Sequence, residues 1–244
     1  MQKTLALILK KQNIGETDRI LTIFSPTLGK KRVIVRSVRK PTSRLAGHLD
    51  TFMVSQLMLT EQNDLPKVTS AVLVESFEQM RSNLADVDRA FAISKIVERV
   101  ILEDVPQQSI FQLTLDAFVR LNDSHRWPAV WLTFLGSLTD RLGLDVSNFR
   151  CTSCNQLPVG KSWWAVIDRA LYCQNCPAPR NGDNIPLSLS AVKLLSLVTK
   201  KNYNLIQRVA IPENAALEAE ELYLREITEW FNKPWLTYAS LRRP

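Results

Sequence analysis

The stretch RILTIFSPTLGKKRVIVRSV, residues 19–38, contains two runs rich in branched and aromatic residues, separated by a short segment with Pro26 and Gly29. Isoleucine, valine, threonine and phenylalanine favour strands, whereas proline and glycine favour the turns between them. The spacing predicts a strand at residues 19–25, a turn, and a second strand at residues 31–38. The N-terminal segment is therefore predicted to be β-structure.

Three further strands are predicted around this pair, at residues 4–10, 52–60 and 68–75. The turn signal Gly15-Glu16-Thr17-Asp18 separates the first of them from the pair. Five short strands in about 75 residues are typical of a small closed barrel, and an OB-fold has that count. A five-stranded SH3-like barrel fits equally well, so the strand pattern alone leaves both barrels open.

Helical periodicity replaces the strand pattern after Phe77. Apolar residues recur every three or four positions in five segments, which predicts helices at residues 84–104, 109–121, 127–142, 188–200 and 213–231. We therefore predict an α+β chain with two domains. A barrel occupies residues 1–80, and a helical domain occupies residues 81–244 and carries a cysteine-bearing insertion at about 148–186.

Four cysteines form one cluster, Cys151-Thr-Ser-Cys154 and Cys173-Gln-Asn-Cys176, with 18 residues between the two pairs. A C-x-x-C pair can turn both sulfurs to one side of a tight knuckle, and two knuckles make a tetrahedral thiolate site for zinc. The spacer contains strand-forming residues at 163–167 and 170–172, which predict the hairpin of a zinc ribbon.

Two disulfides or a redox-active C-x-x-C are the alternatives for this cluster. Disulfides are rare in the reducing cytosol, and redox chemistry needs one such motif beside a βαβ unit rather than two motifs. We predict one structural Zn²⁺ per chain, because four cysteine ligands leave no coordination position for a reacting water.

Positive charge is concentrated near the N-terminus. Residues 1–60 hold 11 Lys and Arg against three acids, whereas the other 184 residues hold 20 against 21. No acid occurs between Arg19 and Leu49, an interval that contains seven closely spaced cations: Lys30, Lys31, Arg32, Arg36, Arg39, Lys40 and Arg44. Strand alternation predicts Arg32 and Arg36 on one face of the strand at 31–38, with the last three cations in or beside a loop.

These seven cations are the predicted DNA contacts, because basic side chains and loop hydroxyls bind phosphate oxygens. A charged edge strand that resists aggregation is the alternative, and the absence of nearby acids favours phosphate binding over it. The barrel segment has only three aromatic residues, Phe24, Phe52 and Phe77, and at least two fit the core. Binding is therefore expected to be mainly electrostatic, weak in sequence preference and steeply salt-dependent.

Motifs for catalysis are missing from the sequence. None of the seven glycines frames G-x-G-x-x-G or a P-loop, neither histidine lies in a zinc-enzyme motif, and every cysteine belongs to the cluster. We therefore predict no enzymatic activity and no small-molecule substrate.

No membrane association is expected either. The longest uncharged stretch, residues 127–139, is shorter than the about 20 residues that a membrane-spanning helix needs. The apolar residues 5–9 are too few for the core of a signal peptide. A cytoplasmic location is therefore predicted.

The order of these features resembles the RecO family of bacterial recombination mediators. The resemblance rests on Ala6-Leu7-Ile8-Leu9, on the motif at residues 15–25, on the basic residues 39–44, on the four cysteines and on the ending at residues 235–241. It covers the whole chain in order. It implies an N-terminal OB-fold followed by a zinc-bearing helical domain.

The resemblance also implies activities and partners. The expected activities are binding of single- and double-stranded DNA, annealing of complementary strands, and assistance in loading RecA onto coated single strands. The expected partners are RecR and the C-terminal tail of single-strand DNA-binding protein, with RecA as an indirect partner. Such a protein would be associated with the nucleoid.

One position departs from the family pattern, which usually has a Lys-Gly pair after the third strand. This chain has Arg36-Ser37 there. Arginine keeps the charge, but the loss of glycine removes a residue that tolerates unusual backbone angles. The path into the basic loop is therefore expected to differ.

Two functions from different classes remain open at this point. The first is a non-enzymatic DNA-binding mediator of recombination. The second is a zinc-ribbon scaffold whose basic barrel binds an acidic protein partner. A DNA affinity that falls steeply with salt, without any partner, would separate them.

Overall fold

The computed structural model describes residues 1–61, 64–123, 126–177 and 184–231. The chain divides into two compact units, Met1–Asp123 and Ser124–Pro244. No helix in the described ranges is both long enough and apolar enough to cross a membrane.

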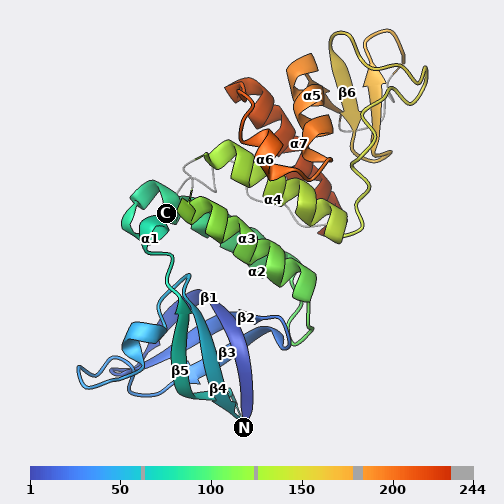
Figure 1. Ribbon diagram of the computed structural model, residues 1–244. Helices are drawn as coiled ribbons and strands as arrows, with labels where there is room; N and C mark the ends of the chain where they lie inside the picture. Colours follow the sequence, from blue (N-terminus) through green and yellow to red (C-terminus); the bar gives the residue numbers. More distant parts are fainter. Residues whose placement is uncertain (62–63, 124–125, 178–183, 232–244) are drawn as a thin grey trace. The chain divides into compact units, whose positions relative to one another are not determined.

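Five strands form a closed barrel in the first unit (Figure 1): β1 (Gln2–Ile14), β2 (Asp18–Ser25), β3 (Gly29–Val35), β4 (Val54–Thr60) and β5 (Lys67–Glu75). Their order around the barrel is β1-β2-β3-β5-β4, and β1 closes the barrel by pairing with β4. The contact between β3 and β5 is parallel, whereas the other neighbouring strands are antiparallel. This arrangement is an OB-fold, so the structure selects that barrel over the SH3-like alternative.

The strand pairs explain both the core and the outer wall of the barrel. Leu21 and Ile23 of β2 and Val33 of β3 are fully buried in the barrel core. Because successive side chains in a strand point to opposite faces, Thr22 and Arg32 face outward. β1 extends beyond the predicted strand at residues 4–10, since its pairing with β2 continues to the end of the β1–β2 hairpin.

Three α-helices and one short 3-10 helix complete the first unit: α1 (Glu78–Ser82), α2 (Leu84–Val100), α3 (Gln108–Asp123) and η1 (Ala46–His48). Aromatic side chains join the barrel to the helices. Phe24 packs edge-on against Phe111, with ring centroids 5.3 Å apart, and Phe52 and Phe77 pack in the same way against Phe118. All three barrel phenylalanines are buried, which confirms that at least two of them belong to the core.

The segment after α2 lies against the start of β3. The helix predicted to reach residue 104 ends at Val100, and the amide of Asp104 donates to the carbonyl of Lys30 at 3.0 Å. Gly29 has φ +70°, and a Cβ atom at this position would lie 2.1 Å from the carbonyl oxygen of Val105. Only glycine permits this close approach of two backbones.

The second unit combines helices with a small sheet. Its helices are α4 (Trp127–Arg141), α5 (Leu189–Val198), α6 (Tyr203–Ile206) and α7 (Glu213–Phe231). Its sheet has the order β7-β6-β8, from β6 (Ser162–Ala165), β7 (Ala170–Cys173) and β8 (Asn184–Leu187). Helix α7 contacts α4, α5 and β8, so it is the element around which this unit is built.

Aromatic and polar contacts fix α4 on α7. The rings of Trp127 and Trp131 stack 4.9 Å apart on α4. The indole nitrogen of Trp131 donates to Glu220 of α7 at 2.9 Å, and Glu220 is only 4% exposed. A buried carboxylate oxygen thus receives a hydrogen bond inside the helical core, as a buried polar group requires.

Candidate nucleic-acid interface and metal centre

The seven predicted DNA contacts lie on β3 and on the segment that follows it. Lys30, Lys31 and Arg32 belong to β3, which ends at Val35, and Arg36 lies in the turn after the strand. Arg36 is therefore not on the strand, in contrast to the expectation that β3 would reach residue 38. The remaining cations, Arg39, Lys40 and Arg44, lie on the exposed basic loop, residues 39–44.

Four of the seven cations, Lys30, Lys31, Arg36 and Arg39, have partners within the first unit. The Lys30 ammonium donates to the carbonyl oxygen of Glu98 at 2.7 Å. Lys31 forms an ion pair with Asp104 at 2.5 Å, and Arg36 forms one with Asp18 at 2.6 Å. Asp18 and Asp104 lie outside the acid-free interval along the sequence but beside its cations in the fold. The positive charge of that interval is therefore partly neutralised by acids from elsewhere in the chain.

Five of the seven cations are exposed: Arg32, Arg36, Arg39, Lys40 and Arg44. Arg39 donates through one guanidinium nitrogen to the carbonyl oxygen of Gly15 at 3.1 Å. Its other guanidinium donors are not used in that bond and remain available for another acceptor. Arg32 lies beside Thr22 of β2, which in turn lies beside Lys10 of β1. These three residues form a row of two cations and a hydroxyl across the barrel wall.

The basic loop is anchored at both ends in the barrel core. Val38, directly before the loop, is 1% exposed, and Leu49 beyond it is fully buried. Between them the backbone makes local turns, with the amide of Ser43 bonded to the carbonyl of Lys40. The anchors fix where the loop begins and ends, while its cations face solvent.

Two aspartates hold cationic groups at this end of the barrel. Asp50 pairs with both Lys11 and Arg81. Burial opposes ionisation of Asp50, but the hydrogen bonds from Lys11 and from the amide of Thr51 outweigh it and lower the pKa of the carboxyl. The pKa of Asp18 is also lowered, first by the hydrogen bond from the amide of Ser37 and then by that from Arg36.

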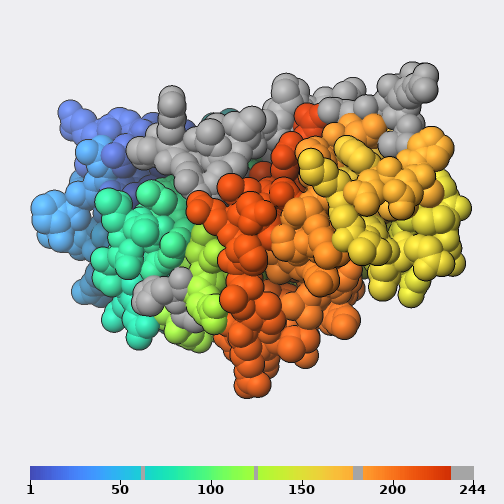
Figure 2. Space-filling view, turned by 90° about the horizontal axis from the view of Figure 1, so that it is seen from above, coloured from blue at the N-terminus to red at the C-terminus, as the bar shows by residue number. Residues whose placement is uncertain are grey.

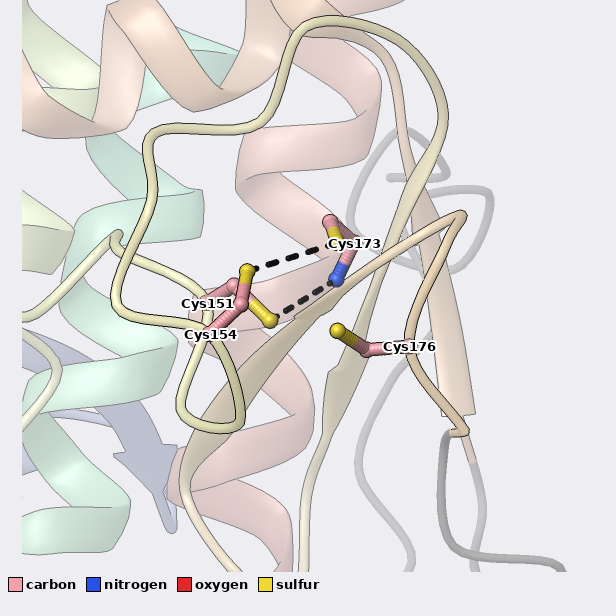
Figure 3. A group of neighbouring side chains, drawn as sticks. All are labelled: Cys151, Cys154, Cys173 and Cys176. Atoms are coloured by element: carbon pink, nitrogen blue, oxygen red, sulfur yellow. Dashed lines mark hydrogen bonds between the residues drawn. The ribbon is translucent and has the colours of Figure 1, made fainter.

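The four cysteines converge on one point in the second unit (Figure 3). Their sulfurs all lie within 4.8 Å of one another, and those of Cys154 and Cys173 are 3.9 Å apart. The first knuckle is joined to the hairpin, because the amide of Thr152 donates to the carbonyl of Leu171 at 2.8 Å. The predicted hairpin is present as β6 and β7, and the four thiols could hold a metal ion.

Hydrogen bonds prepare one of these thiols for ionisation. Burial disfavours the Cys151 thiolate, but backbone amides of Cys154, Cys173 and Ser153 outweigh that effect and lower its pKa to about 6. The hydrogen bond with Cys173, burial and the neighbouring thiols together raise the pKa of Cys176 to about 12. A divalent cation among the sulfurs would offset this opposition to a second thiolate, because metals bind thiolates rather than thiols.

The hairpin that carries Cys173 is fastened to α7 by a buried carboxylate. Trp164 of β6 is fully buried, and its indole nitrogen donates to Glu226 at 2.6 Å. Arg169, in the turn between β6 and β7, donates to the other oxygen of Glu226 at 3.1 Å and lies over the ring of Trp230. In Figure 2 the segment that carries the first cysteine pair, in yellow, forms a continuous part of the surface.

Sequence reasoning missed Asp18 and Glu226 as organising residues. The sequence does contain a signal for Glu226, because helical spacing places it on the same buried face of α7 as Leu222 and Tyr223. A carboxyl group buried on such a face requires a hydrogen-bond or ion-pair partner. Asp18 stands in the turn motif, but nothing along the chain shows that residues 36 and 37 come back to it.

Comparison with known proteins covers both units. The family model described as recombination protein O N terminal matches residues 1–77, and the model described as recombination protein O C terminal matches residues 83–231. The chain is 29% identical over 231 residues to the DNA repair protein RecO of Roseiflexus sp., which covers 93% of this chain and 81% of the relative.

Other curated relatives carry the same name. The DNA repair protein RecO of Dehalococcoides mccartyi is 29% identical over 219 residues, or 89% of this chain and 86% of the relative. That of Acetivibrio thermocellus is 26% identical over 232 residues, or 95% and 92%. With an OB-fold barrel, a helical unit bearing four clustered cysteines and matches to both family models, this chain belongs to the RecO family of DNA repair proteins.

Proposed function

We propose that this protein is a non-enzymatic mediator of recombination that binds single- and double-stranded DNA through its barrel. The observation that carries the proposal is the exposed basic loop on an OB-fold, in a chain of the RecO family. The loop presents Arg39, Lys40 and Arg44, and Arg32 adds a fourth exposed cation on the barrel wall. We assign DNA binding to residues 1–80 and the remaining functions to residues 81–244.

Such a surface can accelerate annealing without ATP. Complementary strands repel each other through their phosphates, and a basic surface that holds both strands lowers this electrostatic cost. The benefit shrinks as salt screens the charges. With Phe24, Phe52 and Phe77 in the core, the barrel has no exposed phenylalanine for base stacking, which supports binding through phosphates rather than bases.

The cysteine cluster is proposed to hold one structural zinc ion. In a tetrahedral site with Zn–S bonds of about 2.3 Å, neighbouring sulfurs lie about 3.8 Å apart. The separation of 3.9 Å between Cys154 and Cys173 fits that edge. Zinc bound by Cys151, Cys154, Cys173 and Cys176 would join the two knuckles of a segment that has little core of its own.

Membership of the family supports the remaining partners. We propose that the protein acts with RecR, engages the C-terminal tail of single-strand DNA-binding protein, and so assists RecA loading on coated strands at the nucleoid. The second unit is the candidate for these protein contacts, because the barrel's exposed surface near the loop is basic rather than apolar.

Annealing of complementary strands tests this proposal directly. The wild-type chain should accelerate annealing without nucleotide, on bare strands and on strands coated by single-strand DNA-binding protein, and the acceleration should fall as salt rises. A requirement for nucleotide hydrolysis would contradict the proposal. Absence of any salt-dependent DNA affinity would favour the scaffold that binds an acidic protein.

A further inference from the structure

The turn at residues 15–18 holds the turn at residues 36–39 through a set of hydrogen bonds. One oxygen of Asp18 accepts from the amide of Ser37 at 2.8 Å, and the other accepts from Arg36 at 2.6 Å. The amide of Arg39 donates to the carbonyl oxygen of Thr17 at 2.9 Å. Segments that are about 20 residues apart along the chain are thus fastened at the point where the basic loop begins.

Asp18 stabilises a strained backbone conformation at this point. Ser37 has φ +54°, in the left-handed region that costs a residue with a Cβ atom about 1 kcal/mol or more. The conformation directs the Ser37 amide to the Asp18 carboxylate and is followed by Val38, whose side chain enters the barrel core. The aspartate therefore stabilises a backbone conformation that serine adopts only at a cost.

Removal of the negative charge of Asp18 can distinguish a positioning role from a purely electrostatic effect on DNA affinity. A carboxylate beside a DNA-binding surface repels phosphates, so its removal should strengthen DNA binding if only net charge mattered. If Asp18 sets the path of the basic loop, its removal should weaken DNA binding instead. The two explanations therefore predict opposite changes in DNA affinity.

We propose that Asp18 is a positioning residue for DNA binding. It holds Ser37 in the left-handed conformation and pairs with Arg36, and it thereby directs Arg39, Lys40 and Arg44 toward one phosphate backbone. Arg36 serves this turn rather than the DNA. The inference rests on the proposed DNA-binding function and assigns the loop geometry within it.

The test compares Asp18→Ala with Glu16→Ala in the full chain, on a mixed-sequence single strand over a range of salt, because alanine removes both the charge and the oxygen that accepts from Ser37. Both variants remove one negative charge from the same turn. Glu16 is exposed and has no hydrogen bond or ion pair with any residue that the structure describes. We expect Asp18→Ala to lower the affinity about tenfold at 0.1 M salt and to flatten the log–log salt slope by about 1 unit, and Glu16→Ala to leave the affinity equal or higher.

A second substitution separates positioning from general damage to the fold. Glycine adopts the left-handed conformation without strain, so Ser37→Gly in the Asp18→Ala background should restore most of the lost affinity and the salt slope. Equal or increased affinity in Asp18→Ala alone, or loss without rescue in the double variant, would overturn the inference. Failure of the wild-type chain to bind DNA would instead overturn the proposed function, and the same titration shows it first.

Discussion

Ser37 shows how one backbone angle connects the sequence to the surface that the barrel presents. Its φ of +54° is the conformation that glycine adopts freely, and the chain keeps it although serine stands there. The hydrogen bond from its amide to Asp18 supplies the compensation. Serine at this position therefore keeps the left-handed angle at the cost of strain at a single residue.

Ser37→Gly should stabilise the first unit by about 1 kcal/mol, because it removes the steric cost of the left-handed angle. Chemical denaturation followed by far-ultraviolet circular dichroism measures the change. Thr42→Gly is the matched control, since Thr42 lies in the adjoining basic loop without a positive φ. Glycine there should leave stability unchanged or lower it, and a stabilising effect equal to that of Ser37→Gly would contradict the explanation.

Glu226 makes the stability of the second unit depend on pH. Burial raises the pKa of this carboxyl, against the opposing effects of Trp164 and Arg169. The folded state therefore binds more protons than the unfolded chain between the ordinary pKa of about 4.5 and the raised folded value. The contribution of this group to stability is present at the acidic end of that interval and is lost as pH rises through the folded pKa.

Glu226→Gln should remove this part of the pH dependence while its amide oxygen still accepts from Trp164. Tryptophan fluorescence can follow unfolding from pH 5 to pH 8, because all six tryptophans lie in residues 124–244. The variant should show a flatter decline of stability with rising pH than the wild-type chain. An identical decline in the two proteins would show that another group is responsible.

At the scale of elements, the sequence predicts what depends on local pattern. All five barrel strands and the five longer helices are found near their predicted places, because alternation and helical periodicity report which face is buried. β8 was not predicted, since Asn184 and Pro186 are poor strand residues and the strand exists because it pairs with β6. The cysteine spacing was sufficient to predict that the four sulfurs lie close together. The partners of Lys30, Lys31 and Arg36 could not be predicted, because they depend on tertiary contacts that no local sequence pattern contains.

The contact between β3 and the segment after α2 depends on a glycine. Gly29→Ala should destabilise the first unit by more than about 3 kcal/mol, because the new Cβ would overlap the backbone of Val105 in a left-handed conformation. Gly47→Ala is the matched control, since a Cβ there meets nothing within 4 Å. Thermal unfolding of the two variants checks the difference, and equal stabilities would show that the two backbones can separate without cost.

The metal centre is predicted to stabilise the ribbon and not the barrel. Cys173→Ser should abolish stoichiometric zinc binding and lower the stability of the second unit by more than about 4 kcal/mol, because metal binding is coupled to folding. DNA affinity of the barrel should persist. Elemental analysis, tryptophan fluorescence and DNA titration measure the three quantities, and freshly reduced, active wild-type protein without zinc would contradict the assignment.

At the scale of the whole molecule, we propose that the first unit binds DNA and that the second unit makes the protein contacts. The exposed cations that could follow a phosphate backbone belong to the barrel and its basic loop, whereas the cysteine cluster and the buried carboxylates organise the second unit. Net positive charge alone does not locate the interface, because four of the seven predicted cations make hydrogen bonds or ion pairs inside the first unit. The central claim is that the basic loop contacts DNA phosphates.

The salt dependence of DNA binding by the Arg39→Ala, Lys40→Ala, Arg44→Ala triple variant tests that claim most directly. The matched control removes three exposed cations of the second unit, Lys193, Lys200 and Arg208. Loss of three phosphate contacts should flatten the log–log slope on single strands by up to about 2 units, equally for unrelated sequences, while the control keeps the wild-type slope. A wild-type slope in the loop variant, or equal flattening in the control, would place the DNA elsewhere and contradict the account.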